Sequence, residues 1–232
     1  MAVITMPTDL VVGGCTVGQA RFDMVEQSDS NGNIATRLLA PPRWTFALQS
    51  RAVQSFAEAG KWEALVYGLR GRVNHLAVYD PGRTEPAGTL RGSPVLNAAV
   101  LAGATSMELV GGTIGTMLAG DWLQIGTGLG TSQTGKVIAD AVSNPATSNA
   151  FTWDNGGAFT WDNGGAFTWT NNGTVTLTFE PPLRAGYPLG TPVAWDRPLV
   201  YCKAQQGNPQ ASYVPGYLGQ GGYALDLIEQ FA

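Results

Sequence analysis

Alternating hydrophobic and polar positions run through much of the chain, in short stretches separated by glycine and proline. Residues 44–49 alternate in this way, and so do the stretches SMELV, DWLQIG, GKVIADAV, TVTLTF and TPVAW between residues 106 and 195. A period of two places successive side chains on opposite faces of a strand. Together with the frequent turn residues, this pattern predicts a mainly β protein.

One stretch has a different period. Apolar residues between positions 53 and 69 recur at spacings of three and four, which predicts a helix over about 51–69 with Ser50 as its N-cap. Gly60 lies in the middle of this stretch and weakens it, so a break at that point is one alternative. A strand is expected to follow at 73–79.

The predicted elements fall into two domains. The segment 81–92 is rich in proline, glycine and charge, which is typical of a domain edge. Strands after residue 199 are expected to return to the first region. We therefore predict a β-sandwich-like N-terminal domain with one helix, formed by 1–82 plus 197–232. It is interrupted by an inserted all-β domain, a small β-barrel or sandwich, at 83–196.

Composition narrows the class of protein. Only 13% of residues are charged and the net charge is −4, which argues against a nucleic-acid-binding surface and favours surfaces buried in an assembly. Cys15 and Cys202 are expected to be free thiols, with a bridge between them as the alternative. The first ten residues lack the pattern of a signal peptide, so we expect a soluble protein made in a cytoplasm.

The stretch GTSQTGKV at 130–137 partly matches a phosphate-binding loop. That motif needs a Ser or Thr hydroxyl after the lysine to bind magnesium, and Val137 stands there instead. The residues that follow alternate like a strand, whereas the motif requires a helix N-terminus. We predict a glycine-rich hairpin loop and no cofactor.

Candidate catalytic residues are few. His75 is the single histidine; we expect a satisfied structural histidine, or one at a subunit contact. A zinc site needs more ligands than one histidine supplies, and there is no G-x-S-x-G stretch for a Ser–His pair. A pair of carboxylates of the glycosidase type stays open, but no acidic residue stands out. We do not expect an enzyme, a cofactor or a metal.

An octad repeat, AFTWDNGG, is written almost three times between residues 150 and 173. Each AFTW predicts a short strand with both aromatics on one face, and each DNGG suits a hairpin turn. The predicted meander packs on the inserted domain or on a neighbouring subunit; contact with a host-surface glycan or a fibre, and a calcium-binding turn array, are the alternatives. The candidate contact residues are Phe151, Trp153, Phe159, Trp161, Phe167 and Trp169.

Four stretches resemble a known family. They are EALVYGLRGRVNHLAVYDPGRTEPAG (63–88), LAGDWLQIG (118–126), VTLTFEPPLRAGYPLGTPV (175–193) and YALDLIEQF (223–231). In this order they resemble the distal tail proteins of tailed bacteriophages, which are structural proteins of the virion. The repeat is not part of that family pattern.

The resemblance implies a subunit of the tail tip or baseplate. Such proteins form a homo-oligomeric ring, commonly a hexamer, that joins the tail tube to the hub, fibre or receptor-binding apparatus. The protein would be assembled in the host cytoplasm and located in the virion, with DNA passing through the ring without specific binding. A heterologous contact between copies, with strand addition at sheet edges, would build the ring. A carbohydrate-binding or host-attachment module, and another tail accessory protein such as a hub or tube-completion component, are the alternatives.

Overall fold

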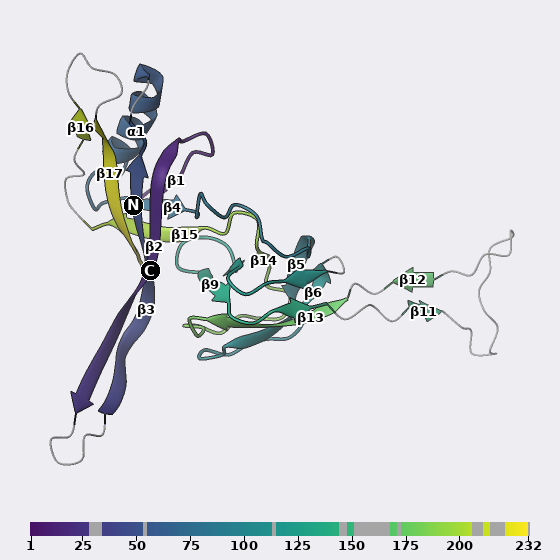
Figure 1. The fold of residues 1–232 in the computed structure, drawn as a ribbon. Coiled ribbons are helices and arrows are strands. Elements are labelled where there is room, and N and C mark those ends of the chain that lie inside the picture. The colour runs from purple at the N-terminus through teal and green to yellow at the C-terminus, as the bar shows by residue number, and fades with distance from the viewer. Residues whose placement is uncertain are drawn as a thin grey trace, which may run out of the picture. The chain divides into compact units, whose positions relative to one another are not determined.

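The computed structural model is mainly β, as predicted. It describes residues 1–27, 34–52, 55–112, 115–143, 148–150, 168–170, 173–205, 211–213 and 221–231. The chain divides into two compact units (Figure 1). Unit 1 comprises 1–85, 127–134 and 196–232, and unit 2 comprises 86–126 and 135–195.

Unit 1 contains one seven-stranded sheet. Its strands in spatial order are β1 (Val3–Thr5), β4 (His75–Val78), β15 (Val200–Ala204), β17 (Gly221–Glu229), β3 (Ile34–Ser50) and β2 (Val12–Gln27), and β16 (Ala211–Tyr213) pairs separately with β17. The pair β1 and β4 is parallel, and the other pairs are antiparallel. The chain after residue 199 therefore supplies the centre of the sheet.

The second layer of unit 1 is helix α1 (Phe56–Gly68), where we expected a second sheet. Alternate residues of the central strands are buried: Trp44, Phe46 and Leu48 in β3, and Tyr223, Leu225 and Leu227 in β17. Trp62, Leu65 and Leu69, from the helix and its C-cap, are buried as well. Burial of these side chains between the helix and the sheet stabilises this unit.

The helix begins later than predicted. Ser55 and not Ser50 is its N-cap, and the Ser55 hydroxyl oxygen accepts a hydrogen bond from the backbone N–H of Glu58 at 3.2 Å. Ser-x-x-Glu is the capping-box sequence, which outweighs an earlier serine. Ser50 instead ends β3, where its Oγ accepts from the backbone N–H of Tyr223 at 2.8 Å. The helix runs through Gly60 without a break.

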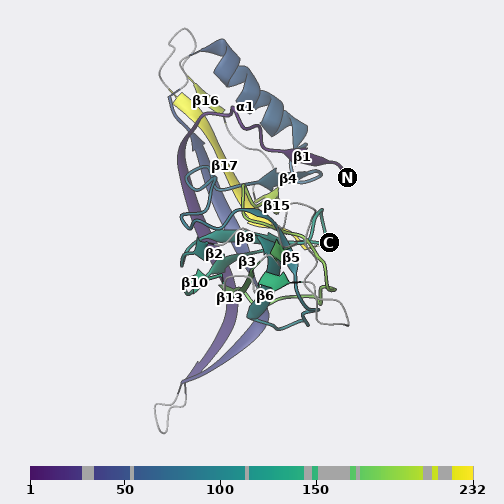
Figure 2. The same ribbon diagram turned by 90° about the vertical axis from the view of Figure 1, so that its right-hand side faces the viewer.

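Strands β2 and β3 extend past the rest of the sheet as a two-stranded arm, residues 21–27 and 34–40. Pairing between β17 and β3 ends at Thr45, so among the described strands β2 alone pairs with β3 beyond that point. Two register shifts surround Phe22, opposite the consecutive prolines at 41–42. Proline cannot donate to the ladder and bulges bend a hairpin, so the arm starts where the regular sheet stops. Figures 1 and 2 show it leaving the sheet at the end opposite helix α1.

Residues 127–134 belong to unit 1, although our prediction placed all of 83–196 in the inserted domain. Two hydrogen bonds hold the end of this segment. The indole N–H of Trp44 donates to the Thr134 carbonyl at 2.9 Å, and the Thr134 hydroxyl donates to the Leu199 carbonyl at 2.9 Å. Backbone carbonyls are unspecific acceptors, so the sequence carries no signal of these contacts.

Unit 2 is a small, nearly closed barrel. Its six strands in order are β14 (Val193–Ala194), β8 (Trp122–Ile125), β9 (Gln133–Val137, whose first two residues belong to unit 1), β13 (Thr174–Glu180), β6 (Ser106–Gly112) and β5 (Gly92–Leu96). A single bridge between Val95 and Pro192 joins the two ends. Two short ladders lie outside the barrel sheet: β7 (Thr116–Met117) with β10 (Ala141–Val142), and β11 (Ser148–Ala150) with β12 (Thr168–Thr170).

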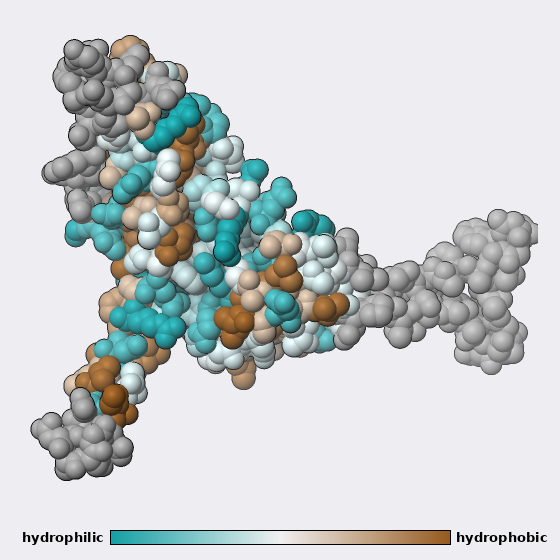
Figure 3. Space-filling view, in the orientation of Figure 1, coloured by the Kyte–Doolittle hydropathy of each residue, from teal (hydrophilic) through white to brown (hydrophobic). Residues whose placement is uncertain are grey.

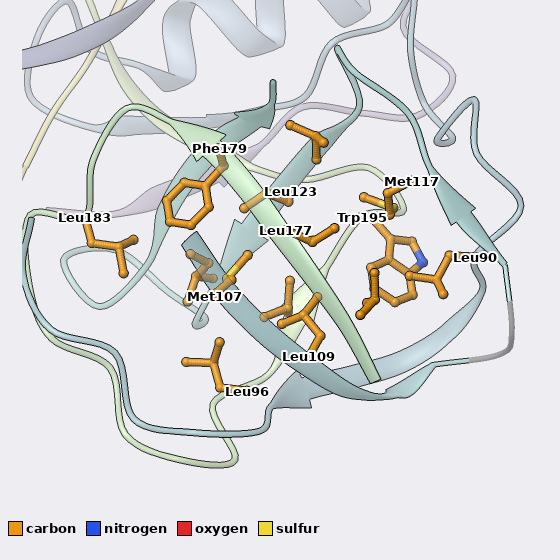
Figure 4. Close-up of a cluster of buried hydrophobic side chains, with 14 residues drawn as sticks. Leu90, Leu96, Met107, Leu109, Met117, Leu123, Leu177, Phe179, Leu183 and Trp195 are labelled. Atoms are coloured by element: carbon orange, nitrogen blue, oxygen red, sulfur yellow. The ribbon is translucent and has the colours of Figure 1, made fainter. Parts of the chain in front are cut away.

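The core of unit 2 is apolar. In β13, Val175, Leu177 and Phe179 are buried at alternate positions, so one face of the strand points inward. Figure 4 shows Leu177 and Phe179 of this strand among other buried side chains, which include Met107, Leu109 and Leu123. A barrel of this size is filled by side chains, as its buried core shows.

Candidate interaction surface

The aromatic repeat lies almost entirely outside the described residues. Of the six candidate contact residues only Trp169 is described, in strand β12, where it pairs with Asn149 of β11. Phe151, Trp153, Phe159, Trp161 and Phe167 lie outside the described part of the chain. The use of these aromatics in packing or in binding stays a prediction.

The stretch 130–137 forms a hairpin connection that leads into a strand. Strands β8 and β9 are neighbours in the sheet, and the glycines at 126, 128 and 130 between them have positive φ. The ammonium of Lys136 lies 4.3 Å from the centre of the Trp122 ring. No helix follows the glycines, so the arrangement of a phosphate-binding loop is not formed.

His75 is buried in β4, and its surroundings differ from those expected of a satisfied histidine. Its Nδ1 has no hydrogen-bond partner in the part of the chain described here. Burial lowers the pKa of the imidazole below its ordinary value, and the charges of Lys203 and the N-terminus act in the same direction. These influences favour the neutral imidazole, and an unpaired buried nitrogen costs stability.

Both cysteines are free, as predicted. Cys15 lies in β2 and Cys202 in β15, with β3 and β17 between them. Three strand spacings amount to about 14 Å, which is beyond the reach of a disulfide. Burial, followed by the charge of Asp80, raises the pKa of the Cys15 thiol to about 11. Burial, followed by the charge of Glu229, raises the pKa of Cys202 well above its ordinary value.

We expect Cys15 to react slowly with iodoacetamide near neutral pH. At pH 8 the thiolate fraction is roughly one quarter for an ordinary thiol and roughly one in a thousand for a pKa of 11. In a Cys202→Ala variant, the alkylation rate at Cys15 is therefore expected to rise about tenfold per pH unit between pH 7 and 10. The same variant unfolded in urea serves as the control and should level off near pH 9. A plateau near pH 9 in the folded protein would contradict the raised pKa.

The arm exposes large apolar side chains on both of its faces. Neighbouring residues in a strand point to opposite faces, and Met24 and Val25 are both exposed, as are Leu38 and Leu39. Val25 and Ile34 are 62% and 66% exposed. Figure 3 shows hydrophobic side chains gathered along the arm. An isolated two-stranded hairpin is marginally stable in water. The arm is therefore a candidate surface for contact with another protein chain.

Helix α1 has a second apolar surface, on the side that faces away from its sheet. Its six exposed residues are Phe56, Ala57, Gly60, Lys61, Ala64 and Tyr67. Phe56 and Tyr67 are 83% and 76% exposed and, being eleven residues apart, project on the same side. We call Phe56, Ala57, Gly60, Ala64 and Tyr67 the outer face of the helix.

The charged residues of α1 all have partners inside the chain. The Lys61 ammonium lies 2.5 Å from the Asp9 carboxylate, and the Glu58 carboxylate lies 2.6 Å from the Arg51 guanidinium. The Glu63 carboxylate accepts a hydrogen bond from the Tyr223 hydroxyl at 2.9 Å. Lys61 is exposed beside the outer face, so this face is apolar and is bordered by the Lys61–Asp9 ion pair.

Other kinds of site find no support within the described ranges. No group of three or more His, Cys, Asp or Glu side chains there is placed to hold a metal ion. No helix among those residues is long and apolar enough to span a bilayer. Comparison with known protein families and with curated protein sequences finds no match for this chain.

Proposed function

We propose that the chain is a non-enzymatic structural subunit of a bacteriophage tail tip that assembles with copies of itself into a ring. The arm is the observation that carries this proposal. It presents apolar side chains on both faces, beyond the point where any third described strand supports it. Burial of such a surface is favourable, and a ribbon of this kind is stable when a neighbour covers it.

The sequence resemblance supplies the identity of the assembly. Its stretches lie on elements of both units: α1, β4 and β17 in unit 1, and β8, β13 and β14 in unit 2. In this proposal unit 1 makes contacts between copies, and the ring joins the tail tube to the hub or fibres. Low charge over the chain favours contacts between proteins and passage of DNA without retention.

Mass measurement of the purified full chain tests this function. We expect light scattering to give a closed ring of defined copy number, hexameric by the resemblance. Val25→Asp with Leu38→Asp places two charges on the arm, and we expect that variant to be monomeric, because buried unpaired charges oppose association. Ile138→Asp is the matched control, since Ile138 is exposed in unit 2 and should leave the ring intact.

Imaging of the assembled phage tail is the second measurement. In an image of the assembled phage tail we expect density for this chain at the tip, with the symmetry found in solution. A wild-type chain that stays monomeric at high concentration and does not join tail tubes would overturn the proposal.

A further inference from the structure

We infer that the arm of one copy packs against the outer face of α1 of another copy, in a head-to-tail contact. This inference rests on the proposed self-assembly and adds the two surfaces that meet. Each copy has one of each surface, and the two lie at opposite ends of unit 1 (Figures 1 and 2). Two different patches that bind each other between copies form a heterologous interface, which closes into a ring or propagates.

The two surfaces match in size and shape. The register of β2 with β3 places Val25, Ile34 and Leu38 on one face of the arm, and all three are exposed. The outer face has small residues at Ala57, Gly60 and Ala64 and large aromatic side chains at Phe56 and Tyr67. Bulky side chains of a ribbon therefore fit between the two aromatics. Such fitting of large groups over small ones is how well-packed interfaces form.

The two surfaces also match in charge. The arm carries Arg21, Asp23, Glu26 and Arg37, a balanced set, and the outer face is bordered by the balanced pair of Lys61 and Asp9. Neither surface repels the other, and neither offers the clustered charge that a nucleic acid or an acidic membrane would need. An uncharged apolar partner suits both, and the chain itself supplies it.

The area suits a weak contact that repeats around a ring. The apolar side chains on one face of the arm and on the outer face together expose on the order of 700 Å². A stable isolated pair usually buries about 1,200 Å² or more in total. One such contact is therefore weak, whereas every copy in a closed ring makes two of them.

Gly60 has no role inside the chain that would require a glycine. A Cβ atom built at this position meets nothing within 4 Å, and glycine is unfavourable in a helix interior. Close approach by another backbone is the ordinary reason for glycine at such a place. A ribbon lying along the outer face makes that approach.

Cross-linking between two single-cysteine variants of the full chain tests the contact. Leu38→Cys marks the arm and Ala64→Cys marks the outer face, and only one of the two chains carries an affinity tag. A short bis-maleimide is added to each variant alone and to an equimolar mixture. The native thiols stay silent because both have raised pKa values, and the wild-type chain checks this. Ile138→Cys in unit 2, mixed with either variant, is the matched control.

In the mixture we expect cross-linked dimers that contain one Leu38→Cys chain and one Ala64→Cys chain. Each variant alone should give at least roughly tenfold fewer cross-linked dimers. Adding Gly60→Gln to the Ala64→Cys chain improves helix propensity and should lower the yield about tenfold or more, because its side chain fills the approach. Cross-links between two Leu38→Cys chains, or between two Ala64→Cys chains, in a yield equal to that of the mixed pair would overturn the inference. So would a ring of normal mass without arm-to-helix pairs, and in that case the proposed function would stand.

Discussion

Replacing Trp62 by Ala is expected to lower the free energy of unfolding of unit 1 by about 3–5 kcal/mol, the usual loss for a large buried aromatic. Trp62 is 1% exposed and lies between helix and sheet. Its ring stacks on that of Tyr223, with centroids 6.0 Å apart and planes 3° from parallel. Its indole N–H also donates to the Val11 carbonyl at 3.2 Å. The substitution removes all three contributions and leaves a cavity.

Urea denaturation with hydrogen exchange measures this effect and assigns it to a unit. Two units do not unfold as one two-state system, so protection of β17 and β3 is followed separately from that of β13. Tyr223→Phe is the matched control. It keeps the stacked ring and loses only the hydrogen bond to Glu63, for about 1 kcal/mol. Equal losses in the two variants would show that the packing of Trp62 does not hold the helix to the sheet.

Sequence periodicity predicted a mainly β protein, but it did not place every strand and said little about which strands are covered. The stretch 135–142, predicted as one strand, is divided between β9 and β10. A period of two places Val175, Leu177 and Phe179 on one face, and in the structure these residues are buried. The pairs Met24 and Val25, and Leu38 and Leu39, are equally apolar, yet they are exposed. Burial depends on whether another layer lies over a strand, and this is decided by parts of the chain far away in sequence.

The helix boundary and the domain boundary show two further limits. Ser50 and Ser55 are both acceptable N-caps, and only the pairing of Ser50 with Val12 of β2 shows that Ser50 is still in a strand. Residues 127–134 are attached to unit 1 through backbone carbonyls, which every residue has. Of the candidate sites, the repeat could be picked out by its pattern alone. The outer face of α1 could not, because small residues in a predicted helix do not show which side faces the sheet.

Replacing Asp121 by Ala is expected to lower the free energy of unfolding of unit 2 by about 3 kcal/mol or more. The buried carboxylate of Asp121 accepts three backbone N–H groups: that of Ala87 at 2.8 Å, Gly88 at 3.1 Å and Leu118 at 2.9 Å. It thereby joins the segment entering the barrel to the turn before β8. Alanine leaves all three donors without their acceptor. The bond from Gly88 is buried and those from Ala87 and Leu118 are part-buried, and a buried unpaired donor costs about 1–3 kcal/mol.

The protein contains a matched control for this residue. Asp140 accepts the backbone N–H of Ala119 at 2.8 Å, but it is exposed, so water replaces the lost bond in Asp140→Ala. We expect that variant to lose under about 1 kcal/mol. Asp121→Asn keeps one acceptor oxygen but turns donor hydrogens toward donors, so its loss should approach that of alanine. The free energies of unfolding of all three variants are measured by urea denaturation, with hydrogen exchange at β8 and β13. If Asp121→Ala and Asp140→Ala lost the same amount, the carboxylate would not be the tie between the entering segment and the barrel.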